Sequence, residues 1–243
     1  MHLPSYREHV SSEKLVVFIH GFMGSPDHFD DLAELVHQQG CSSMSILLPG
    51  HGAGMRAFVK SNMDDWTRHV QDEIGAVRDK YREIILVGHS MGGLLALSAS
   101  LVRENRVAGV ILIATPLKIN LKSVYLKLRL LTFPGTNEIK QAYVKSKSIG
   151  RSAIFFYPCI IRPILSLFRL IRQTRRRLGE VFVPVYLFYS KSDETVAYQS
   201  AKLFYEGLCN TERTVFTLDR SWHAFYYEDE RSVIAEKLLS LIV

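Results

Sequence analysis

Cysteine is scarce in this sequence of 243 residues, and motifs for metals and nucleotides are lacking. Cys41, Cys159 and Cys209 are odd in number and far apart, which disfavours a disulfide framework and a zinc site. The sequence has no P-loop and no Gly-x-Gly-x-x-Gly run, so neither kind of nucleotide site is expected. We therefore expect no cofactor and no metal. Residues 1–9 contain no apolar signal core, which together with the unpaired cysteines favours a cytoplasmic protein.

Long uninterrupted hydrophobic runs are lacking as well. The most apolar stretch, residues 154–171, is broken by two prolines and two arginines, which argues against a helix that spans a membrane. Hydrophobic residues make up 47% of the chain and charged residues 22%, as is typical of a globular protein. The length suits a single α/β domain.

Apolar runs typical of strands alternate with segments of helical periodicity. The expected strands are residues 15–19, 45–48, 84–87, 107–113, 184–189 and 213–218. The expected helices are residues 27–39, a segment capped by Asn62, and residues 91–99, 196–208 and 229–242. This alternation predicts an α/β fold with a mostly parallel sheet of about six strands and helices on both faces.

The most informative stretch is Gly88-His89-Ser90-Met91-Gly92, which lies between a predicted strand and a predicted helix. A Gly-x-Ser-x-Gly turn of this kind holds the serine at a strained corner, and its glycines let the backbone pass without a Cβ clash. The turn raises the hydroxyl above the sheet and directs a helix N-terminus at the charge that develops during acyl transfer. Ser90 is therefore the candidate nucleophile; the alternative interpretation is a turn with a surface serine.

His223 is the only histidine that follows Ser90 in the chain. Hydrolases with such an elbow order their groups as serine, acid, histidine, so His223 is the single candidate for the base. The acid candidates are Asp193, which follows a predicted strand, and Asp219. We favour Asp193, because its short loop places the carboxylate at the carboxyl edge of the sheet, where open α/β sheets form their sites. Glu194 is a weaker rival that we expect to face solvent.

Two backbone amides are candidates for stabilising an oxyanion. One belongs to Met91, the residue after the candidate nucleophile. The other, by its position after strand 15–19, belongs to Phe22 in the turn His20-Gly21-Phe22-Met23-Gly24. The same two residues are expected to contact the substrate. Each such donor is typically worth roughly 10²–10³ in kcat.

These motifs resemble those of the α/β-hydrolase superfamily and, within it, compact carboxylesterases similar to bacterial monoacylglycerol lipases. The matching pieces are His20-Gly21-Phe22-Met23-Gly24, Pro49-Gly50-His51-Gly52, Gly88-His89-Ser90-Met91-Gly92-Gly93, Ser192-Asp193-Glu194 and Ser221-Trp222-His223. They occur in family order along nearly the whole chain. The resemblance implies an α/β-hydrolase fold with Ser90, Asp193 and His223 as catalytic triad and with Phe22 and Met91 as oxyanion hole.

The departure from the family pattern is an insertion at residues 117–179, where family members carry a small lid. Residues 1–116 and 180–243 would form the hydrolase core. The insertion contains fourteen Lys or Arg residues and one acid, Glu138, so its formal charge is +13, against +6 for the whole chain and −7 for the remainder. A lid over the site or an interfacial helix fits this composition. The arginines could contact an anionic membrane, which would place the protein peripherally at the inner membrane surface, could steer anionic substrates to the site, or could simply be solvated. Nucleic-acid binding is not expected, because no recognition motif is present.

The predicted function is serine carboxylester hydrolysis through an acyl-enzyme. The substrate would be a small-molecule ester or lipid, such as a short- or medium-chain ester or a monoacylglycerol-like lipid. A thioesterase or a lysophospholipase would use the same triad. A further alternative is a non-catalytic module that binds a ligand or a membrane, although three catalytic groups in the correct order count against it.

Overall fold

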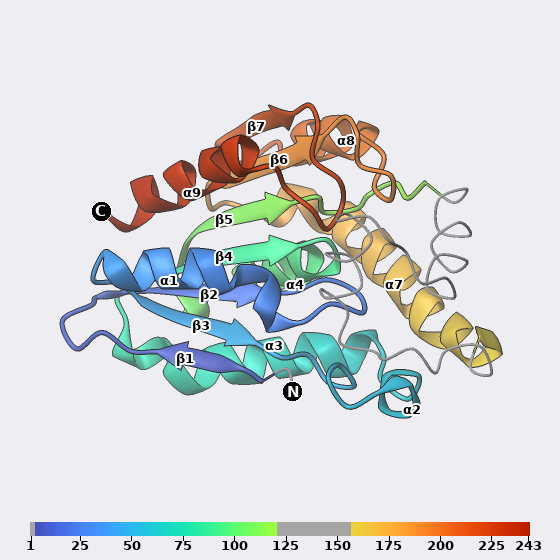
Figure 1. Ribbon diagram of the computed structural model, residues 1–243, viewed down its shortest axis with the longest axis horizontal. Coiled ribbons are helices and arrows are strands. Elements are labelled where there is room, and N and C mark those ends of the chain that lie inside the picture. The colour runs from blue at the N-terminus through green and yellow to red at the C-terminus, as the bar shows by residue number, and fades with distance from the viewer. Residues whose placement is uncertain (1–2, 121–156) are drawn as a thin grey trace.

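The computed structural model describes residues 3–120 and 157–243, and its centre is a seven-stranded sheet of order β1-β3-β2-β4-β5-β6-β7 (Figure 1). The strands are β1 (Ser5–Arg7), β2 (Lys14–Ile19), β3 (Ser42–Ile46), β4 (Glu83–His89), β5 (Val107–Ile113), β6 (Val185–Ser190) and β7 (Arg213–Leu218). All neighbours are parallel except β1, which is antiparallel to β3. The predicted parallel sheet is confirmed.

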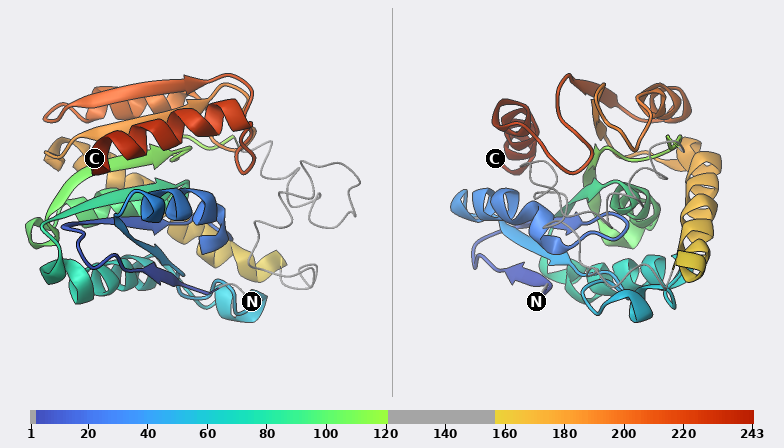
Figure 2. Two further views of the ribbon diagram at one scale, coloured as in Figure 1. Left: turned by 60° about the vertical axis from the view of Figure 1, so that its left-hand side comes forward. Right: turned by 45° about the vertical axis from the view of Figure 1, so that its right-hand side comes forward.

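Helices cover both faces of this sheet, as predicted, and form two layers (Figure 2). The helices are α1 (Asp30–Gln38), α2 (Met55–Phe58), α3 (Met63–Val77), α4 (Met91–Ser100), α7 (Tyr157–Arg177), α8 (Gln199–Gly207) and α9 (Glu228–Ile242). Helices α1 and α9 pack on one face, and α3, α4, α7 and α8 pack on the other. The alternation of side chains along β2 supplies both cores: Leu15 and Val17 point to one layer, and Val16 and Phe18 to the other.

Two details of the sheet differ from the sequence-based expectation. The count of about six strands is one short, because β1 has only three residues and no apolar alternation to predict it. The strand expected at residues 45–48 begins earlier, at Ser42. Serines predominate in β3, and the sheet edge supplies a polar partner for the buried Ser42, whose hydroxyl accepts a hydrogen bond of 3.0 Å from the amide of His9.

The cap expected at Asn62 is confirmed. Its side-chain oxygen accepts hydrogen bonds from the amides of Asp64, at 2.8 Å, and Asp65, at 3.4 Å. The Asp65 carboxylate in turn accepts from the amide of Asn62 at 3.1 Å, which completes a capping box. The box fixes the start of α3, whose buried Trp66 and Val70 then face the sheet.

The predicted insertion falls largely on residues 121–156, which lie outside the described residues, so the division into core and lid stays a prediction. Its first part remains attached to the fold, because Ile119 forms an isolated bridge with Val196. Its last part, α7, packs against α3 and α4. None of the helices in the described ranges has both the length and the hydropathy to cross a membrane.

Candidate active site

Ser90 lies at the corner between β4 and α4, where the elbow was predicted. Its φ of 54° and ψ of −121° belong to a sparsely populated region for a residue with a side chain. The Ser90 amide donates a hydrogen bond of 2.8 Å to the carbonyl of Ile113 in β5, so the neighbouring strand helps to hold the strained corner.

Two glycines make this corner sterically possible. A Cβ at Gly88 would lie 2.4 Å from the Cα of Gly93, and a Cβ at Gly92 would lie 1.9 Å from the carbonyl oxygen of Ile19. Both contacts are with backbone, which cannot move aside without displacing α4 or β2. The spacing of glycines around Ser90 in the sequence therefore reflects the close approach of α4 to the sheet.

His223 lies between Ser90 and Asp193. Its Nε2 is 3.0 Å from the hydroxyl oxygen of Ser90, and its Nδ1 is 2.9 Å from Oδ2 of Asp193. All three groups are nearly inaccessible: Ser90 is 7% exposed, His223 8%, and the side chain of Asp193 3%. The three residues come from the ends of β4 and β6 and from the loop after β7, so the sheet brings them to one edge.

The environment of Asp193 keeps this carboxyl group ionised. Burial alone would raise its pKa, but the charge of His223 and hydrogen bonds from His223 and from the backbone outweigh the burial. The backbone donors are the amides of Thr195, at 2.7 Å, and Val196, at 2.8 Å, both to Oδ1. The pKa of Asp193 therefore lies below its usual value, and Oδ2 is left as an anionic acceptor for the imidazole.

The two rival acids lie elsewhere. Asp219 is exposed, and its carboxylate pairs with Lys191 at 2.6 Å. Glu194 does not face solvent as expected: it is half-buried, and its Oε2 accepts a hydrogen bond of 3.0 Å from the backbone amide of His223. The expectation for Glu194 was wrong because its backbone partner is distant in sequence, so spacing alone does not reveal the contact.

Glu230, in the first turn of α9, holds the loop that carries His223. Its Oε1 accepts hydrogen bonds from the amides of Asp219, at 2.7 Å, and Arg220, at 3.0 Å. Its Oε2 accepts from the amide of Ser221, at 2.8 Å, and from the Ser221 hydroxyl. Sequence reasoning missed this residue, because three acids in a row at a helix N-terminus look like ordinary complements of the helix dipole.

Replacing Glu230 by glutamine is expected to destabilise the protein by about 1.5–3 kcal/mol, since a buried carboxylate that accepts several hydrogen bonds would be exchanged for a group with only one acceptor oxygen. We also expect kcat for ester hydrolysis to fall, because the loop positions His223. Urea unfolding and steady-state kinetics measure both effects. Asp229→Asn is the matched control, since Asp229 is exposed and pairs with Arg220. Unfolding curves for Glu230→Gln that coincide with those of the control would contradict the clamping role.

A layer of histidines lies behind the site. The ring centroids of His28 and His89 are 4.2 Å apart, and those of His89 and His223 are 4.9 Å apart. Nε2 of His89 is 2.7 Å from the carbonyl oxygen of His223, so His89 donates to this oxygen and packs beneath the loop rather than toward Ser90. Burial is the main cause that holds the pKa values of His28 and His89 well below the usual range, and nearby positive charge adds to it. Both rings are therefore neutral.

Acid should destabilise the fold through His28. The unfolded chain binds a proton at this residue near pH 6.5, whereas the folded state resists it, so the contribution to stability is present above pH 6.5 and is lost as pH falls toward the folded pKa. For one such histidine the loss between pH 7 and pH 5 is at most about 2 kcal/mol. His28→Phe should remove that part of the pH dependence, because a phenylalanine side chain does not bind a proton. The substitution should also cost no hydrogen bond at Nε2, which has no partner among the described residues.

The measurement for His28 is the free energy of unfolding in urea at pH 7, 6 and 5. The same substitution at His69, which lies at the surface of α3 beside Glu73, is the control and should keep the wild-type pH dependence. An unchanged slope for His28→Phe would show that the folded protein protonates His28 as readily as the unfolded chain does.

The two predicted oxyanion donors lie on elements that adjoin Ser90. Met91 is the first residue of α4, where backbone amides lack partners within the helix. Phe22 lies in the turn after β2, and a Cβ at the preceding Gly21 would be 2.9 Å from the Cβ of Ser90, so this turn approaches Ser90 closely. The ring of Phe22 packs edge-on against Phe58, with the ring centroids 5.0 Å apart. The roles of both amides stay predictions.

Two further histidines connect this turn to the segment after β3 by hydrogen bonds. Nε2 of His51 accepts a hydrogen bond of 3.1 Å from the amide of Met23, and Nε2 of His20 accepts one of 3.1 Å from the amide of Leu48. His51 thus links the loop after β3 to the turn after β2 through a hydrogen bond. In the described parts of the chain, no three His, Cys, Asp or Glu side chains gather as a metal site would require.

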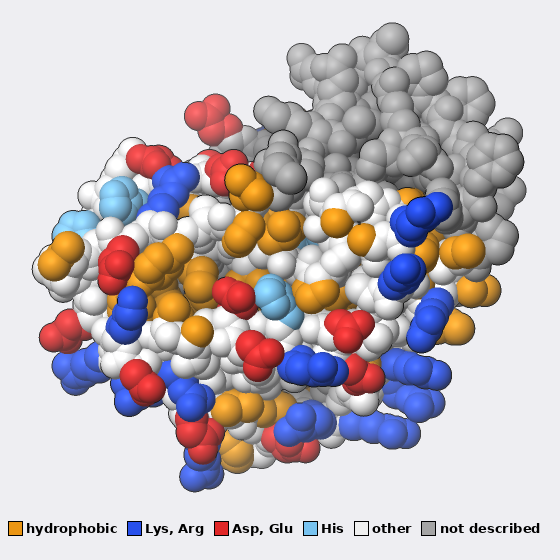
Figure 3. Space-filling view, turned by 90° about the horizontal axis from the view of Figure 1, so that it is seen from below, with side chains coloured by type: hydrophobic (Ala, Val, Ile, Leu, Met, Phe, Trp, Pro, Cys, Tyr) orange, Lys and Arg blue, Asp and Glu red, His pale blue; other side chains and the backbone are white. Residues whose placement is uncertain are grey.

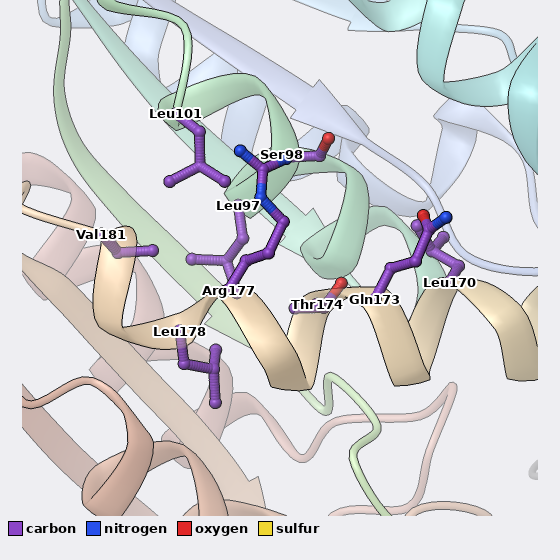
Figure 4. Close-up of a pocket in the computed structure, with 9 residues that line it drawn as sticks. All are labelled: Leu97, Ser98, Leu101, Leu170, Gln173, Thr174, Arg177, Leu178 and Val181. Atoms are coloured by element: carbon purple, nitrogen blue, oxygen red, sulfur yellow. The ribbon is translucent and has the colours of Figure 1, made fainter.

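A small cavity lies between α4 and α7, apart from the groups around Ser90 (Figure 4). It has a volume of about 30 Å³ and is lined by leucines of both helices together with Gln173, Thr174 and Arg177. That volume holds about one water molecule, so we regard it as a packing defect rather than a substrate pocket.

Comparison with known proteins gives consistent matches along the chain. The family model described as serine aminopeptidase, S33, matches residues 10–230. A thermostable monoacylglycerol lipase of Bacillus sp. (strain H-257) is 25% identical over 229 residues, which cover 92% of this chain and 88% of the lipase. A carboxylesterase of Bacillus subtilis (strain 168) is 20% identical over 236 residues, which cover 95% of this chain and 92% of the esterase. A solved structure from work on two metagenome-derived lipolytic enzymes, LipS and LipT, superposes with a TM-score of 0.77 at 25% identity. The match covers 98% of this chain and 96% of the solved one.

Proposed function

Because this chain belongs to the serine aminopeptidase S33 family of α/β-hydrolases and is a carboxylic-ester hydrolase, we propose that it cleaves acyl esters with Ser90 as nucleophile, His223 as base and Asp193 as acid. The observation that carries the proposal is the continuous hydrogen-bonded chain from the Ser90 hydroxyl through His223 to Asp193, with distances of 3.0 and 2.9 Å. The strained backbone at Ser90 supports it, since such strain clusters at functional sites.

These distances support the following course of the proposed reaction. Nε2 of His223 takes the proton of the Ser90 hydroxyl as its oxygen attacks the ester carbonyl carbon, and Asp193 stabilises the imidazolium at Nδ1. The carbonyl oxygen becomes an oxyanion, for which the amides of Met91 and Phe22 are the proposed donors. The imidazolium then gives its proton to the leaving alkoxide, and an acyl-enzyme remains. Water, deprotonated by His223, attacks the acyl group; the acid leaves and Ser90 regains its proton.

For the substrate we propose a small ester or lipid, in the range from short- and medium-chain esters to monoacylglycerol-like lipids. The names of the relatives, a monoacylglycerol lipase and a carboxylesterase, support this range. Thioester and lysophospholipid hydrolysis are the alternatives within the same chemistry, because the same three groups would perform them. We also propose a cytoplasmic location, which the three free cysteines support.

Labelling with a fluorophosphonate tests the proposal directly. We expect covalent modification at Ser90, found by peptide mass spectrometry, and loss of labelling in the Ser90→Ala variant. Profiling with aryl esters of increasing chain length, monoacylglycerols, thioesters and lysophospholipids then separates the substrate classes by kcat/KM. An enzyme that neither labels at Ser90 nor hydrolyses any of these substrates would favour a module that only binds its ligand.

A further inference from the structure

The outer face of α7 combines apolar and cationic side chains. Ile161, Leu165 and Phe168 are 61%, 54% and 40% exposed, and their spacing of four and three residues places them in one stripe along the helix. Five exposed arginines lie on the same side of α7: Arg162, Arg169, Arg172, Arg175 and Arg176. We call these eight residues the α7 outer face.

Packing of the opposite side fixes which residues point outward. Ile160, Leu170, Ile171 and Leu178 are buried, and α7 lies against α3 and α4 through this side. The exposed stripe is therefore not a consequence of a loosely attached helix. Scattered exposed apolar residues are common on proteins, but three in one stripe form a continuous surface with no partner among the described residues.

No acid of the described ranges neutralises the charge of this face. Helix α7 contains no acidic residue. Arg177, at its end, pairs with Glu180, but none of the five arginines of the α7 outer face forms an ion pair with an acid of the described ranges. On the face shown in Figure 3, basic side chains predominate at the lower right edge, whereas acidic and basic side chains are interspersed over the other described parts of that face.

We propose that the α7 outer face docks the protein on an anionic lipid bilayer. A surface helix with apolar residues flanked by arginines suits the interface of a membrane, where the apolar side chains enter the acyl boundary and the guanidinium groups stay among the headgroups. A free polyanion such as RNA would meet the arginines but would leave Ile161, Leu165 and Phe168 exposed to water. The combination of both features favours the bilayer.

The orientation of α7 adds a consequence for the site. The chain leaves α7 at Arg177 and enters β6 at Val185, the amino end of that strand, so the other end of α7 lies at the carboxyl edge of the sheet (Figure 1). Ser90 follows β4 at this same edge. Ile161 and Leu165 lie in the half of α7 nearer to this edge, and Phe168 lies just past the midpoint of the helix. Docking through it would bring the edge that carries Ser90 close to the lipid surface.

Sedimentation with vesicles tests the proposal with the whole protein. Vesicles of phosphatidylcholine alone are compared with vesicles that also contain phosphatidylglycerol, at about 50 mM and about 500 mM salt. We expect binding to the anionic vesicles at low salt and release at high salt. The charge variant, Arg172→Gln with Arg175→Gln and Arg176→Gln, should bind the anionic vesicles roughly a hundredfold more weakly at low salt.

Two further variants make the comparison specific. Changing Lys80, Arg82 and Lys202 to glutamine removes three exposed cations on other elements and should leave vesicle binding close to that of the wild type. Changing Ile161, Leu165 and Phe168 to serine keeps the charge but removes the stripe, and it should weaken binding as well. Circular dichroism and hydrolysis of a soluble short-chain ester without vesicles show whether each variant is folded and active.

Equal binding to neutral and anionic vesicles, or a charge variant that binds as tightly as the wild type, would overturn the proposal. Binding of an RNA oligonucleotide that depends on the arginines, with vesicle binding unaffected by the serine substitutions, would assign the face to nucleic acid instead. The proposal does not depend on the proposed reaction. An inactive protein that still binds anionic vesicles would refute the reaction alone, and an active protein that fails to bind them would refute the docking alone.

Discussion

Ser90→Ala and His223→Ala are each expected to lower kcat for ester hydrolysis by about 10⁴-fold or more, with the fold preserved. The hydroxyl oxygen of Ser90 and Nε2 of His223 are 3.0 Å apart, and in the proposed reaction both act in the same proton transfer. Removal of either group therefore removes the same step, and the double variant should be little slower than the single ones. Steady-state kinetics on a soluble ester, with active-site titration of the wild type, measures the effect.

Ser98→Ala is a suitable control for the serine substitution, because Ser98 lies on the same helix, α4, but lines the small cavity on its far side. It should keep nearly wild-type kcat. Circular dichroism and thermal unfolding establish that the inactive variants are folded. A variant of Ser90 or His223 that retained more than about a tenth of wild-type kcat, a loss of less than ~1.4 kcal/mol, would remove that residue from the proposed triad.

Asp193→Asn is the second change with a large expected effect, a loss of about 10³–10⁴ in kcat. The amide would present a donor to Nδ1 of His223 or only a neutral acceptor, so the imidazole would be held in the wrong tautomer or less firmly. Oδ1 of Asp193 also accepts two backbone amides, so some loss of stability should accompany the change. Kinetics and urea unfolding separate the two effects.

Asp219→Asn is the matched control, since Asp219 lies in the same loop region but pairs with Lys191 at the surface. An exposed ion pair contributes little to stability, roughly 0–1 kcal/mol, and this one does not touch the imidazole. Its kcat should therefore stay near the wild-type value. The opposite ranking of the two variants would transfer the role of the acid to Asp219.

The sequence predicted those parts of the fold in which the local geometry accepts only one or two types of residue. Gly88 and Gly92 could be identified because only glycine tolerates the contacts of 2.4 and 1.9 Å that the elbow imposes. Asn62 could be identified because its side chain and that of Asp65 cap the helix within four residues. His223 could be named as the candidate base because it is the only histidine that follows Ser90 in the sequence.

The parts that it did not predict depend on contacts between distant segments. Glu194 and Glu230 hold the backbone around His223, yet nothing near them in the sequence distinguishes them from solvent-facing acids. Ser42 belongs to a strand because its neighbours at the sheet edge satisfy its hydroxyl, and those neighbours lie more than thirty residues away. Polar residues whose partners are remote carry no periodic signal, so only the assembled structure identifies them.

The position of Glu230 has a consequence for how the protein becomes active during its synthesis. Ser90 and its elbow are synthesised more than 130 residues before His223, and the Glu230 carboxylate that holds the His223 loop follows later still, in α9. Domains begin to fold while the ribosome is still extending them. A nascent chain that has not yet reached residue 230 can therefore contain the corner around Ser90 without a held base beside it, so we expect hydrolysis to begin only after residues 223–230 have been made and have docked.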